Sequence, residues 1–477
     1  MNRYVINIIS VLCISYTQEI SEGLIVYTPY NAADSTDIAT YITDENLNII
    51  NSWEHEYAPA SMAYLMKDST IWYPSKVPYP IMSSGGVGGR IQHLDWNNNI
   101  LWDYRLSNDS LQHHHDIEIL PNGNILLLAW ERKSLEDALM MGRNVIETPL
   151  QQMWSEAIFE IEPIGTDSAN IVWEWHLWDH LVQDIDPSLD NYGEIHEHPE
   201  LLDINLGVVG FGPAVDNADW IHFNSIHYNH DLNQIILSSR MMSEIYIIDH
   251  STTTEEAASH SGGNSGRGGD FLYRWGNPGN YMRGTNYTQI LNSQHSVDWI
   301  DPGYPGEGNI LIFNNFHYGQ NSAVIEISPP IQPDGSYAIE EESPFGPYGW
   351  EWMYYNNNNL TALFQSGAFR LENGNTFITE AHEARMFEVT LDGEIVCNYT
   401  IGTLNEIINR AQKYPSNYLY PYILGDINSD EIVNILDIIT IVNLIINNEP
   451  YNLVADSNSD YTIDILDIIN FINIILD

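Results

Sequence analysis

The sequence predicts an all-β fold, a six-bladed β-propeller, followed by a small α-helical domain with paired EF-hand-like calcium loops. Two observations carry this prediction. A unit of roughly four short strands recurs six times, and a loop of oxygen-bearing side chains occurs twice near the C-terminus, each time before an apolar helix. We therefore divide the 477 residues into a signal peptide (1–23), a propeller (24–414), a linker (415–424) and a calcium-binding domain (425–477).

The N-terminal segment has the pattern of a signal peptide. Arg3 precedes a short apolar run from Val5 to Ile14, which suits the core of a signal peptide and is too short to span a bilayer. We therefore expect a secreted, periplasmic or cell-surface protein. Cys13 lies in this segment, so its removal leaves Cys397 alone and no intrachain disulfide is expected.

The charge balance excludes some classes of partner. The chain carries 65 acidic and 16 basic residues, a formal net charge of −49. Nucleic acid is not an expected partner, because phosphates are bound through Lys and Arg. A solvated acidic surface explains most of this charge, and calcium binding fits it as well. No stretch of the mature chain is expected to span a membrane.

The repeat is most easily seen in a strand that ends in aromatic residues. An alternating strand precedes each copy, and the connecting turns carry Asp, Asn, Gly and Pro. The six copies are Asn48–Trp53, Asn99–Tyr104, Asn170–Trp175, Asp270–Trp275, Pro347–Trp352 and Glu394–Tyr399.

A hairpin follows the aromatic strand and completes the unit. Its turn carries Asn122-Gly123 in one copy and Asn373-Gly374 in another, pairs that favour the positive φ of such turns. Six units predict a ring whose N- and C-terminal strands share one blade, whereas the rival arrangement of two packed sandwiches gives no reason for six copies. The insertions Asn191–Asp219 and Ser251–Asp270 are expected to project from one face of the disc.

Ring closure would gather polar side chains at the axis, because the innermost strand of each blade lines the central channel. Alignment of the hairpins on their turns gives equivalent positions to His115, Asn224, His295 and Ser366, with His114 and His222 one or two residues earlier. Clustered imidazoles can bind a transition metal, act as nucleophile, acid or base, or bind an anion. A single histidine is more often structural. The prediction of a shared pocket therefore depends on the equivalent positions of these histidines in successive hairpins.

Arginines are scarce, so those beside the strand motifs are candidates for binding an oxyanion at the axis. The alternative for each is a surface or inter-blade salt bridge. They are Arg90, Arg240, Arg274, Arg283 and Arg385.

An ordered set of motifs resembles the bacterial arylsulfate sulfotransferases. The set comprises HHDIEILPNGNIL, DWIHFNSIHYN with ILSSRMMSEIYIID, FLYRWGNPG, QHSVDW with GNILIFNN, and SGAFRLENGNTFI with ARMFEVTLDGEIV. It extends over most of Leu24–Tyr399. The resemblance implies a six-bladed propeller that transfers a sulfuryl group from a phenolic sulfate donor to a phenol acceptor. It also implies a sulfohistidine intermediate and no nucleotide cofactor.

The resemblance also implies site residues: three histidines and one arginine on the axis. The motifs place the first two histidines at His222 and His295, and the order of the blades places the nucleophile at His382. The stretch NILIFNNFHYGQ, where the arginine is expected, has none, so His317 or Arg385 is the candidate substitute. His115 is a further candidate from its axial register. Two other functions remain open: a non-catalytic binding or adhesion protein, and an axial metal site.

The C-terminal repeats have the spacing of calcium-binding loops. Oxygen ligands at positions 1, 3 and 5, a backbone carbonyl at 7 and a carboxylate at 12 are the pattern that Ca²⁺ requires. The first loop supplies Asp426, Asn428, Asp430, Ile432 and Asp437, and the second supplies Asp456, Asn458, Asp460, Thr462 and Asp467.

These loops resemble type I dockerins, because an Asp at position 12 is followed by a single helix. The usual Gly of position 6 is Glu431 in one loop and Tyr461 in the other, which predicts weaker calcium binding. The apolar helix Ile435–Ile446 is expected to be buried against its twin. The resemblance implies a cohesin partner on a scaffold or cell surface; the alternative is a stabilising cap without a partner.

Overall fold

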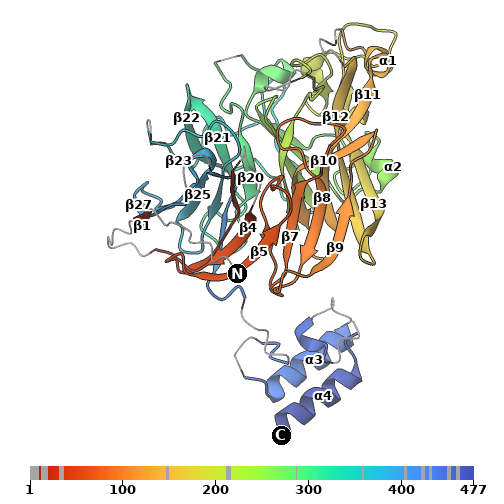
Figure 1. Cartoon of the computed structure of the whole chain (residues 1–477). Coiled ribbons are helices and arrows are strands. Elements are labelled where there is room, and N and C mark those ends of the chain that lie inside the picture. Colours follow the sequence, from red (N-terminus) through yellow and green to blue (C-terminus); the bar gives the residue numbers. More distant parts are fainter. Residues whose placement is uncertain are drawn as a thin grey trace. The chain divides into compact units, whose positions relative to one another are not determined.

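A computed structural model gives the fold of the chain. It describes residues 10–11, 20–31, 37–144, 146, 150–210, 216–285, 287–356, 359–401, 406–419, 425–428, 432–447, 453–457 and 462–476. The chain divides into two compact units, Met1–Ser416 and Asn417–Asp477 (Figure 1). The first unit consists mainly of strands and the second of helices, as the sequence predicts.

The first unit contains six antiparallel sheets of four or five strands, which confirms the all-β propeller. In the following lists the strands run from the axis outward. Blade 1 is β29 (Gln412–Pro415), β2 (Gly23–Tyr27), β4 (Ile38–Thr43) and β5 (Ile49–His55); blade 2 is β6 (Tyr64–Leu65), β7 (Ile71–Lys76), β8 (Gly89–Leu94) and β9 (Ile100–Arg105); blade 3 is β10 (Leu111–Ile119), β11 (Ile125–Ser134), β12 (Gln152–Ile164) and β13 (Ser168–His176). Blade 4 is β16 (Phe223–Asn229), β17 (Gln234–Ser239), β18 (Glu244–Asp249) and β19 (Tyr273–Trp275); blade 5 is β20 (His295–Trp299), β21 (Ile310–Tyr318), β22 (Asn321–Ile327) and β23 (Trp352–Tyr354); blade 6 is β24 (Gly367–Arg370), β25 (Thr376–Glu380), β26 (Arg385–Val389), β27 (Ile395–Thr400) and β1 (Ser10–Val11).

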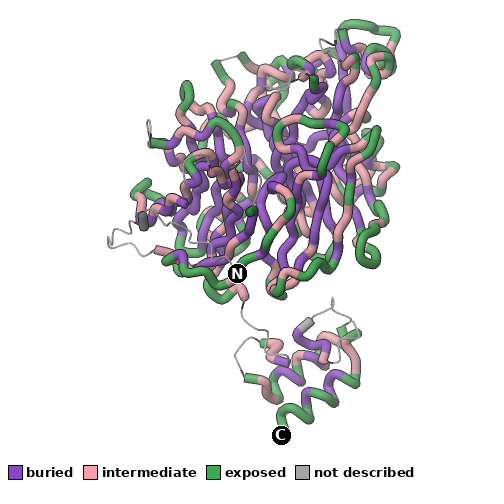
Figure 2. The backbone as a smooth tube through the Cα atoms, in the orientation of Figure 1, coloured by how far each residue is buried: buried purple, intermediate pink, exposed green. Residues whose placement is uncertain are grey.

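Short elements complete the propeller unit. Two-stranded sheets pair β3 (Pro29–Asn31) with β28 (Glu406–Ile408) and β14 (Leu181–Val182) with β15 (Leu202–Asp203). The helices are α1 (Leu135–Met140), α2 (Thr254–Ala257) and the 3₁₀ turns η1 (Leu177–Asp179), η2 (Ile195–Glu197), η3 (Pro278–Tyr281) and η4 (Ala381–Glu383). The strands are largely buried, and exposure concentrates in their connections (Figure 2).

The ring closes as predicted, with N- and C-terminal strands in one blade. The C-terminal strand β29 pairs with β2 and forms the innermost strand of blade 1. Lys413 of β29 also reaches Glu388 of blade 6, with 2.8 Å between Nζ and Oε2, and both side chains are buried. A buried charge of each sign therefore joins the last blade to the first.

The recurring aromatic residues connect each blade to the next. In all six blades a Trp or Tyr of the fourth strand donates a hydrogen bond to a backbone carbonyl before or at the start of the fourth strand of the following blade. The bonds run from Trp53 to Asp95 O, Trp102 to Ser168 O, Trp175 to Gly269 O, Trp275 to Pro347 O, Trp352 to Leu391 O and Tyr399 to Glu45 O, at 2.6–2.9 Å. The pattern that reveals the repeat in the sequence is thus the contact between neighbouring blades.

All six predicted aromatic strands overlap observed strands, but two begin later than predicted: Asp270–Trp275 overlaps β19 only from Tyr273 onward, and Pro347–Trp352 overlaps β23 only at its last residue. Gly123 and Gly374 have φ of 83° and 88° in their hairpin turns, whereas their Asn partners do not have positive φ. The sixth-blade copy, Glu394–Tyr399, matches β27. The prediction for Pro347–Trp352 was wrong because the Gly- and Pro-rich segment before Trp352 is not part of the strand, which begins only at Trp352.

The insertion Ser251–Asp270 does not project from the disc, so that prediction was wrong. Its short helix α2 lies beside β13 of blade 3 (Figure 1). The indole of Trp173 donates to Thr252 Oγ1 at 3.1 Å, and that of Trp175 donates to Gly269 O at 2.8 Å. These two indole hydrogen bonds therefore hold the insertion against β13 of blade 3.

The second unit contains α3 (Ile435–Asn447), η5 (Leu453–Ala455) and α4 (Ile465–Leu476). Its core contains Ile438, Ile441 and Phe471. The expectation that the apolar helix is buried all round was wrong, because Ile435 and Ile439 are more than half exposed. One face packs against the other helix, and the opposite apolar face remains open to solvent.

Most of the predicted signal segment 1–23 lies outside the described residues, apart from β1, which pairs with β27, and residues 20–23, of which Gly23 begins β2. The side chain of Cys397 is buried. Within the described ranges, none of the helices combines the length and the apolar character needed to cross a lipid bilayer.

Tyr399→Phe tests the contact that closes the ring. The substitution removes the hydroxyl that donates to Glu45 O at 2.6 Å and leaves that carbonyl without this partner. We expect the free energy of unfolding to fall by about 1–3 kcal/mol, measured by urea denaturation. Tyr287→Phe, at a tyrosine that is 99% exposed, is the matched control. Equal stability of the two variants would contradict an energetic role for the closing bond.

Candidate active site

Three of the predicted histidines meet at the axis. The rings of His115 and His222 lie edge to face with centroids 4.6 Å apart, and both side chains are almost fully buried. Burial, followed by the charges of His222, His114 and His295, lowers the pKa of His115 well below its usual value. His115, His222 and His295 therefore share one electrostatic environment, although they come from blades 3, 4 and 5.

His222 is oriented by a buried carboxylate. Its Nδ1 lies 2.5 Å from Asp219 Oδ2, on the segment that leads into β16. Burial alone would raise the pKa of Asp219, but the charge of His222 and the hydrogen bond outweigh it, so the pKa is lowered. An ionised Asp219 accepts a hydrogen bond from Nδ1–H, so the lone pair of a neutral His222 ring is on Nε2, the arrangement that makes an imidazole a nucleophile or base.

His115 ends a chain of three hydrogen-bonding groups. Its Nδ1 lies 2.9 Å from Nδ1 of His114, whose Nε2 lies 2.8 Å from Glu156 Oε2. Burial, then the charge of Asp219, raises the pKa of Glu156 well above its usual value, while burial lowers the pKa of His114 to about 3. All three groups are thus neutral near pH 7: Glu156 donates to His114 Nε2, His114 donates to His115 Nδ1, and His115 carries its proton on Nε2.

Arg240 supplies the positive charge of the site. It lies in the turn between β17 and β18, and its N–H donates to the carbonyl of His222 at 3.1 Å. Burial lowers the pKa of Arg240 to about 10, opposed by Asp219. Burial, and next the charge of Arg240, lowers the pKa of His295 well below its usual value, which places the guanidinium near that imidazole.

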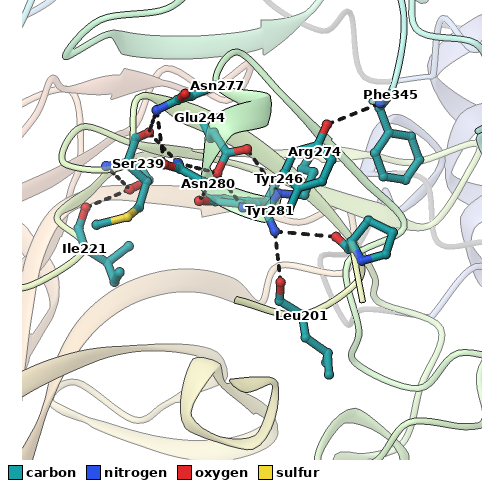
Figure 3. A network of polar contacts seen from close by, with 12 residues as sticks. Leu201, Ile221, Ser239, Glu244, Tyr246, Arg274, Asn277, Asn280, Tyr281 and Phe345 are labelled. Carbon is teal, nitrogen blue, oxygen red and sulfur yellow. Dashed lines mark hydrogen bonds and ion pairs between the residues drawn. The ribbon is translucent and has the colours of Figure 1, made fainter. Parts of the chain in front are cut away.

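A buried polar network supports the turn that carries Arg240 (Figure 3). Glu244, just beyond the turn, accepts from Arg274 Nε at 3.0 Å and Nη2 at 2.6 Å, and both side chains are fully buried. At the other end of the turn, Ser239 Oγ donates to Ile221 O, adjacent to His222. Such bidentate pairing restricts the turn and the guanidinium that it carries.

Gln294 connects this network to His295. Its Nε2 donates to the carbonyls of Ser239 and Glu244, at 2.9 and 2.8 Å, and so spans the base of the Arg240 turn. The next residue is His295, whose Nδ1 lies 2.9 Å from Asn315 Oδ1. Because the amide oxygen only accepts, Nδ1 of His295 carries its proton and Nε2 has the lone pair.

A glycine-rich loop, Ser83–Gly89, covers the cluster. The carbonyl of Gly86 accepts from the His115 N–H at 2.7 Å, and Gly89 N–H donates to Nδ1 of His113 at 2.9 Å. A Cβ on Gly86 would lie 1.9 Å from the His115 ring, and one on Gly85 would lie 3.3 Å from the His222 ring. Only residues without side chains can approach the imidazoles this closely.

The structure does not place His382 and Arg385 with the other predicted site residues. His382, in η4, contacts Phe364 and Glu383, and no described contact joins it to the axial histidines. Arg385 pairs with Glu380 at 3.0 Å and lines a separate polar cavity of about 260 Å³. Both lie one strand or more from the axis, because η4 follows the second strand of blade 6 and Arg385 begins the third.

Arg240 is one of the five arginines that the sequence offers as candidates for binding an oxyanion, but it was not selected as a site residue. Other site residues were not predicted. Asp219 could have been found, because it begins the motif DWIHFN that contains His222. Asn315 occupies the stretch where an arginine was expected. Glu156 and the axial pair of Arg410 with Asp116, at 2.7 Å, carry no distinguishing sequence signal.

The comparison with protein families identifies the family of the chain. The arylsulfotransferase (ASST) family model matches residues 17–332, about two thirds of the chain. The chain belongs to the arylsulfotransferase family. The match extends over the axial histidines, Asp219 and Arg240 and ends within blade 5. No curated protein matches this arylsulfotransferase-family chain.

Solved structures similar to this arylsulfotransferase-family chain are distant. A protein of unknown function from Bacteroides caccae has 12% identity and a TM-score of 0.43, with 83% of this chain and 99% of that chain covered. A putative 6-phosphogluconolactonase from Bacteroides fragilis has 9% identity and a TM-score of 0.37, with 84% and 100% covered. A streptogramin B lyase has 12% identity and a TM-score of 0.34, with 83% and 88% covered.

His113→Gln tests the burial of neutral imidazole beside the site. Burial, then His114, lowers the pKa of His113 to about 3, against about 6.5 in the unfolded chain. Between about pH 6.5 and pH 3 the unfolded state binds a proton at His113 that the folded state does not bind. The contribution of His113 to the free energy of unfolding is therefore fully present above about pH 6.5 and decreases as the pH drops toward 3. We expect this variant to lose less stability on acidification, by up to about 1.4 kcal/mol per pH unit.

The measurement is urea denaturation at pH 7.5, 6.0 and 5.0. His230→Gln is the control, because the side chain of His230 is 73% exposed and its removal should leave the pH slope as in the unmodified protein. An unchanged slope in His113→Gln would mean that His113 is protonated in the folded state.

Proposed function

We propose that the axial cluster transfers a sulfuryl group from a phenolic sulfate ester to a phenol, through a sulfohistidine and without a nucleotide donor. The observation that carries the proposal is the pairing of His222 with Asp219 at 2.5 Å, beside His115, His295 and Arg240. It joins an oriented nucleophile, a proton donor and a cation, which are the three groups that sulfuryl transfer requires.

In the first step His222 Nε2 attacks the sulfur of the donor. The N–S bond forms as the bond between sulfur and the phenolic oxygen breaks. Asp219 stabilises the positive charge that develops on the imidazole through its bond to Nδ1–H. We assign Arg240 and His295 as the groups that bind the sulfuryl oxygens, and the equatorial charge chiefly to the guanidinium.

The departing phenolate receives its proton from His115 Nε2. Along the chain described above, His115 regains a proton at Nδ1 from His114, and His114 regains one at Nε2 from Glu156. The step leaves a phenol, a neutral sulfohistidine zwitterion and an ionised Glu156. His115 then carries the lone pair on Nε2, so it acts as the base toward the acceptor phenol in the reverse step.

Substrate access requires movement of the Ser83–Gly89 loop. The imidazoles of His115, His222 and His295 are at most 3% exposed beneath it. Gly86, with φ of 69°, and the neighbouring glycines provide the backbone freedom for such movement. Closure over a bound ester would also exclude water, which favours transfer to a phenol over hydrolysis.

The decisive measurement is a trapped adduct. We expect the protein to transfer sulfate from 4-nitrophenyl sulfate to a phenol, and rapid quenching at neutral pH to give an acid-labile sulfohistidine at His222. His222→Gln should abolish the adduct, and Glu156→Gln should lower the rate by ~10²–10⁴-fold. An adduct at His382 would contradict the assignment of His222 and would support the nucleophile that the order of the blades predicts.

Two arginine variants test the source of the positive charge. Arg240→Gln should lower kcat/KM by ~10²–10³-fold, the range for loss of one group that binds developing charge. Arg385→Gln, which alters the separate cavity of blade 6, is the matched control and should retain the rate. A larger loss of kcat/KM in Arg385→Gln than in Arg240→Gln would contradict the assignment of Arg240 as the cation of the site.

A binding or adhesion protein is the second candidate function, favoured by the open apolar face of the C-terminal unit. On α4, Ile465, Leu466 and Ile469 are each about half exposed or more. Such a face suits a protein partner, for which the resemblance suggests a cohesin or a cell-surface scaffold. The absence of turnover with aryl sulfates, in folded and calcium-loaded protein, would favour this function.

We further propose that the C-terminal unit binds two calcium ions. Of the predicted ligands, Asp430, Asn458 and Asp460 lie outside the described residues. Asp437 and Asp467, each at loop position 12, are fully buried. Their Oδ1 atoms accept from the Ile427 and Ser457 N–H groups, both at 2.8 Å, so each carboxylate faces the start of its own loop. This placement fits a carboxylate that completes a ring of oxygen ligands.

Asp437→Asn and Asp467→Asn test the two loops separately. Each variant should bind one calcium ion fewer by isothermal titration calorimetry, because a neutral amide replaces the carboxylate of position 12. Calcium at ~100 times its Kd should stabilise the unmodified unit by about 2.7 kcal/mol for each bound ion. Asp392→Asn, in an exposed turn of blade 6, is the control. Unchanged stoichiometry in both loop variants would refute the assignment.

A further inference from the structure

A second histidine cluster lies outside the axial site, between blades 3 and 4. His180 follows η1, whereas His260 and Asp270 belong to the insertion that packs along β13. One ligand atom from each residue lies within 4.8 Å of the others. Among the described residues, no other group of at least three His, Cys, Asp or Glu side chains meets this limit, and the axial histidines do not.

The hydrogen bonds of His180 determine which nitrogen faces Asp270. Nε2 lies 2.8 Å from the carbonyl of Ala257, which only accepts, so Nε2 carries the proton. Nδ1 of a neutral His180 then directs a lone pair at Asp270 Oδ1, 2.8 Å away. Two lone pairs at this distance repel each other, so a cation must lie between them: either a second proton on the ring or a metal ion.

The surroundings are those of a metal ligand. A histidine that binds a metal through one nitrogen commonly donates its other N–H to a backbone carbonyl, as His180 does to Ala257. Trp175 stacks parallel to the ring, with 5.4 Å between centroids and 4° between planes. A Cβ on Gly269 would lie 2.6 Å from His180 Nε2, so the chain approaches the ring at a residue that has no side chain. His180 is therefore held in one orientation and is fully buried.

His260 completes the set from the solvent side. Its Nδ1 lies 2.8 Å from the same oxygen, Asp270 Oδ1, and its side chain is 61% exposed. Two imidazole nitrogens and one carboxylate oxygen are a ligand set for Zn²⁺, whereas Ca²⁺ and Mg²⁺ prefer oxygen alone. Ligands at about 2.0–2.1 Å from a tetrahedral zinc ion stand ~3.3 Å apart. The two distances to Asp270 Oδ1, both 2.8 Å, therefore need to lengthen by only about half an ångström, and all three ligand atoms already lie within 4.8 Å of one another.

We propose that His180, His260 and Asp270 bind one Zn²⁺ ion, with a fourth position open to water beside His260. The ion would connect the segment after β13 to the insertion of the next blade. It would add to the hydrogen bond from His180 to Ala257 O and to the Trp173 and Trp175 indole bonds from β13 itself. It would act as a structural tether between blades, independent of the axial chemistry.

The test measures zinc binding to the full chain with calcium present in excess, so that the C-terminal loops do not take up zinc. We expect one equivalent of Zn²⁺ after dialysis, by elemental analysis, and a raised Tm. His260→Gln and Asp270→Asn should weaken binding by at least ~10-fold and abolish the rise in Tm. His230→Gln, an exposed histidine beside Asp231, is the matched control and should bind as the unmodified chain does.

Two outcomes would overturn the proposal. If the unmodified chain binds no zinc, the cation between His180 and Asp270 is a proton, and the cluster is a buried ion pair. If His260→Gln and His230→Gln bind zinc equally, the ion lies elsewhere. Because His260 is largely exposed, its variant should fold, and Co²⁺ absorption in the visible range gives a readout that does not depend on stability or on sulfuryl transfer.

Discussion

The hydrogen bond from an outer-strand aromatic residue to the next blade is the contact on which the rest of the structure depends. Each blade buries its faces only against its two neighbours, so none is stable alone. Six such bonds, from Trp53 to Tyr399, fix the angle between successive blades. The axial distances that matter for chemistry, such as the one between His115 and His222, are set by these peripheral contacts.

The active-site cluster depends on this arrangement in a second way. Its imidazoles are buried, and each has one nitrogen fixed by a partner from its own blade: Asp219, His114 or Asn315. Gln294 extends the network from blade 5 to the turn of blade 4. The pKa values depend on ring closure, because the charges of His222 and His295 lower the pKa of His115, and the charge of Arg240 lowers that of His295.

The sequence predicts the fold well because its strongest signals are local and periodic. Aromatic strands, alternating strands and Asn-Gly turns identify the blades, and the meeting of His115, His222 and His295 follows from ring closure. Arg240 was noted but not assigned, because a turn residue reaches the axis only through the shape of its turn. His382 was assigned by order along the chain, which says nothing about radial position.

The burial of the C-terminal strand inside blade 1 has a consequence for biosynthesis. Strand β2 begins near residue 23 but receives its inner partner β29 only when residue 412 has been made. Until then the inner edge of β2 is open to other chains, and the long loop must be closed before the ring gains its cooperativity. A polypeptide whose synthesis stops before β29 therefore remains an open arc, with an unpaired strand edge that favours aggregation.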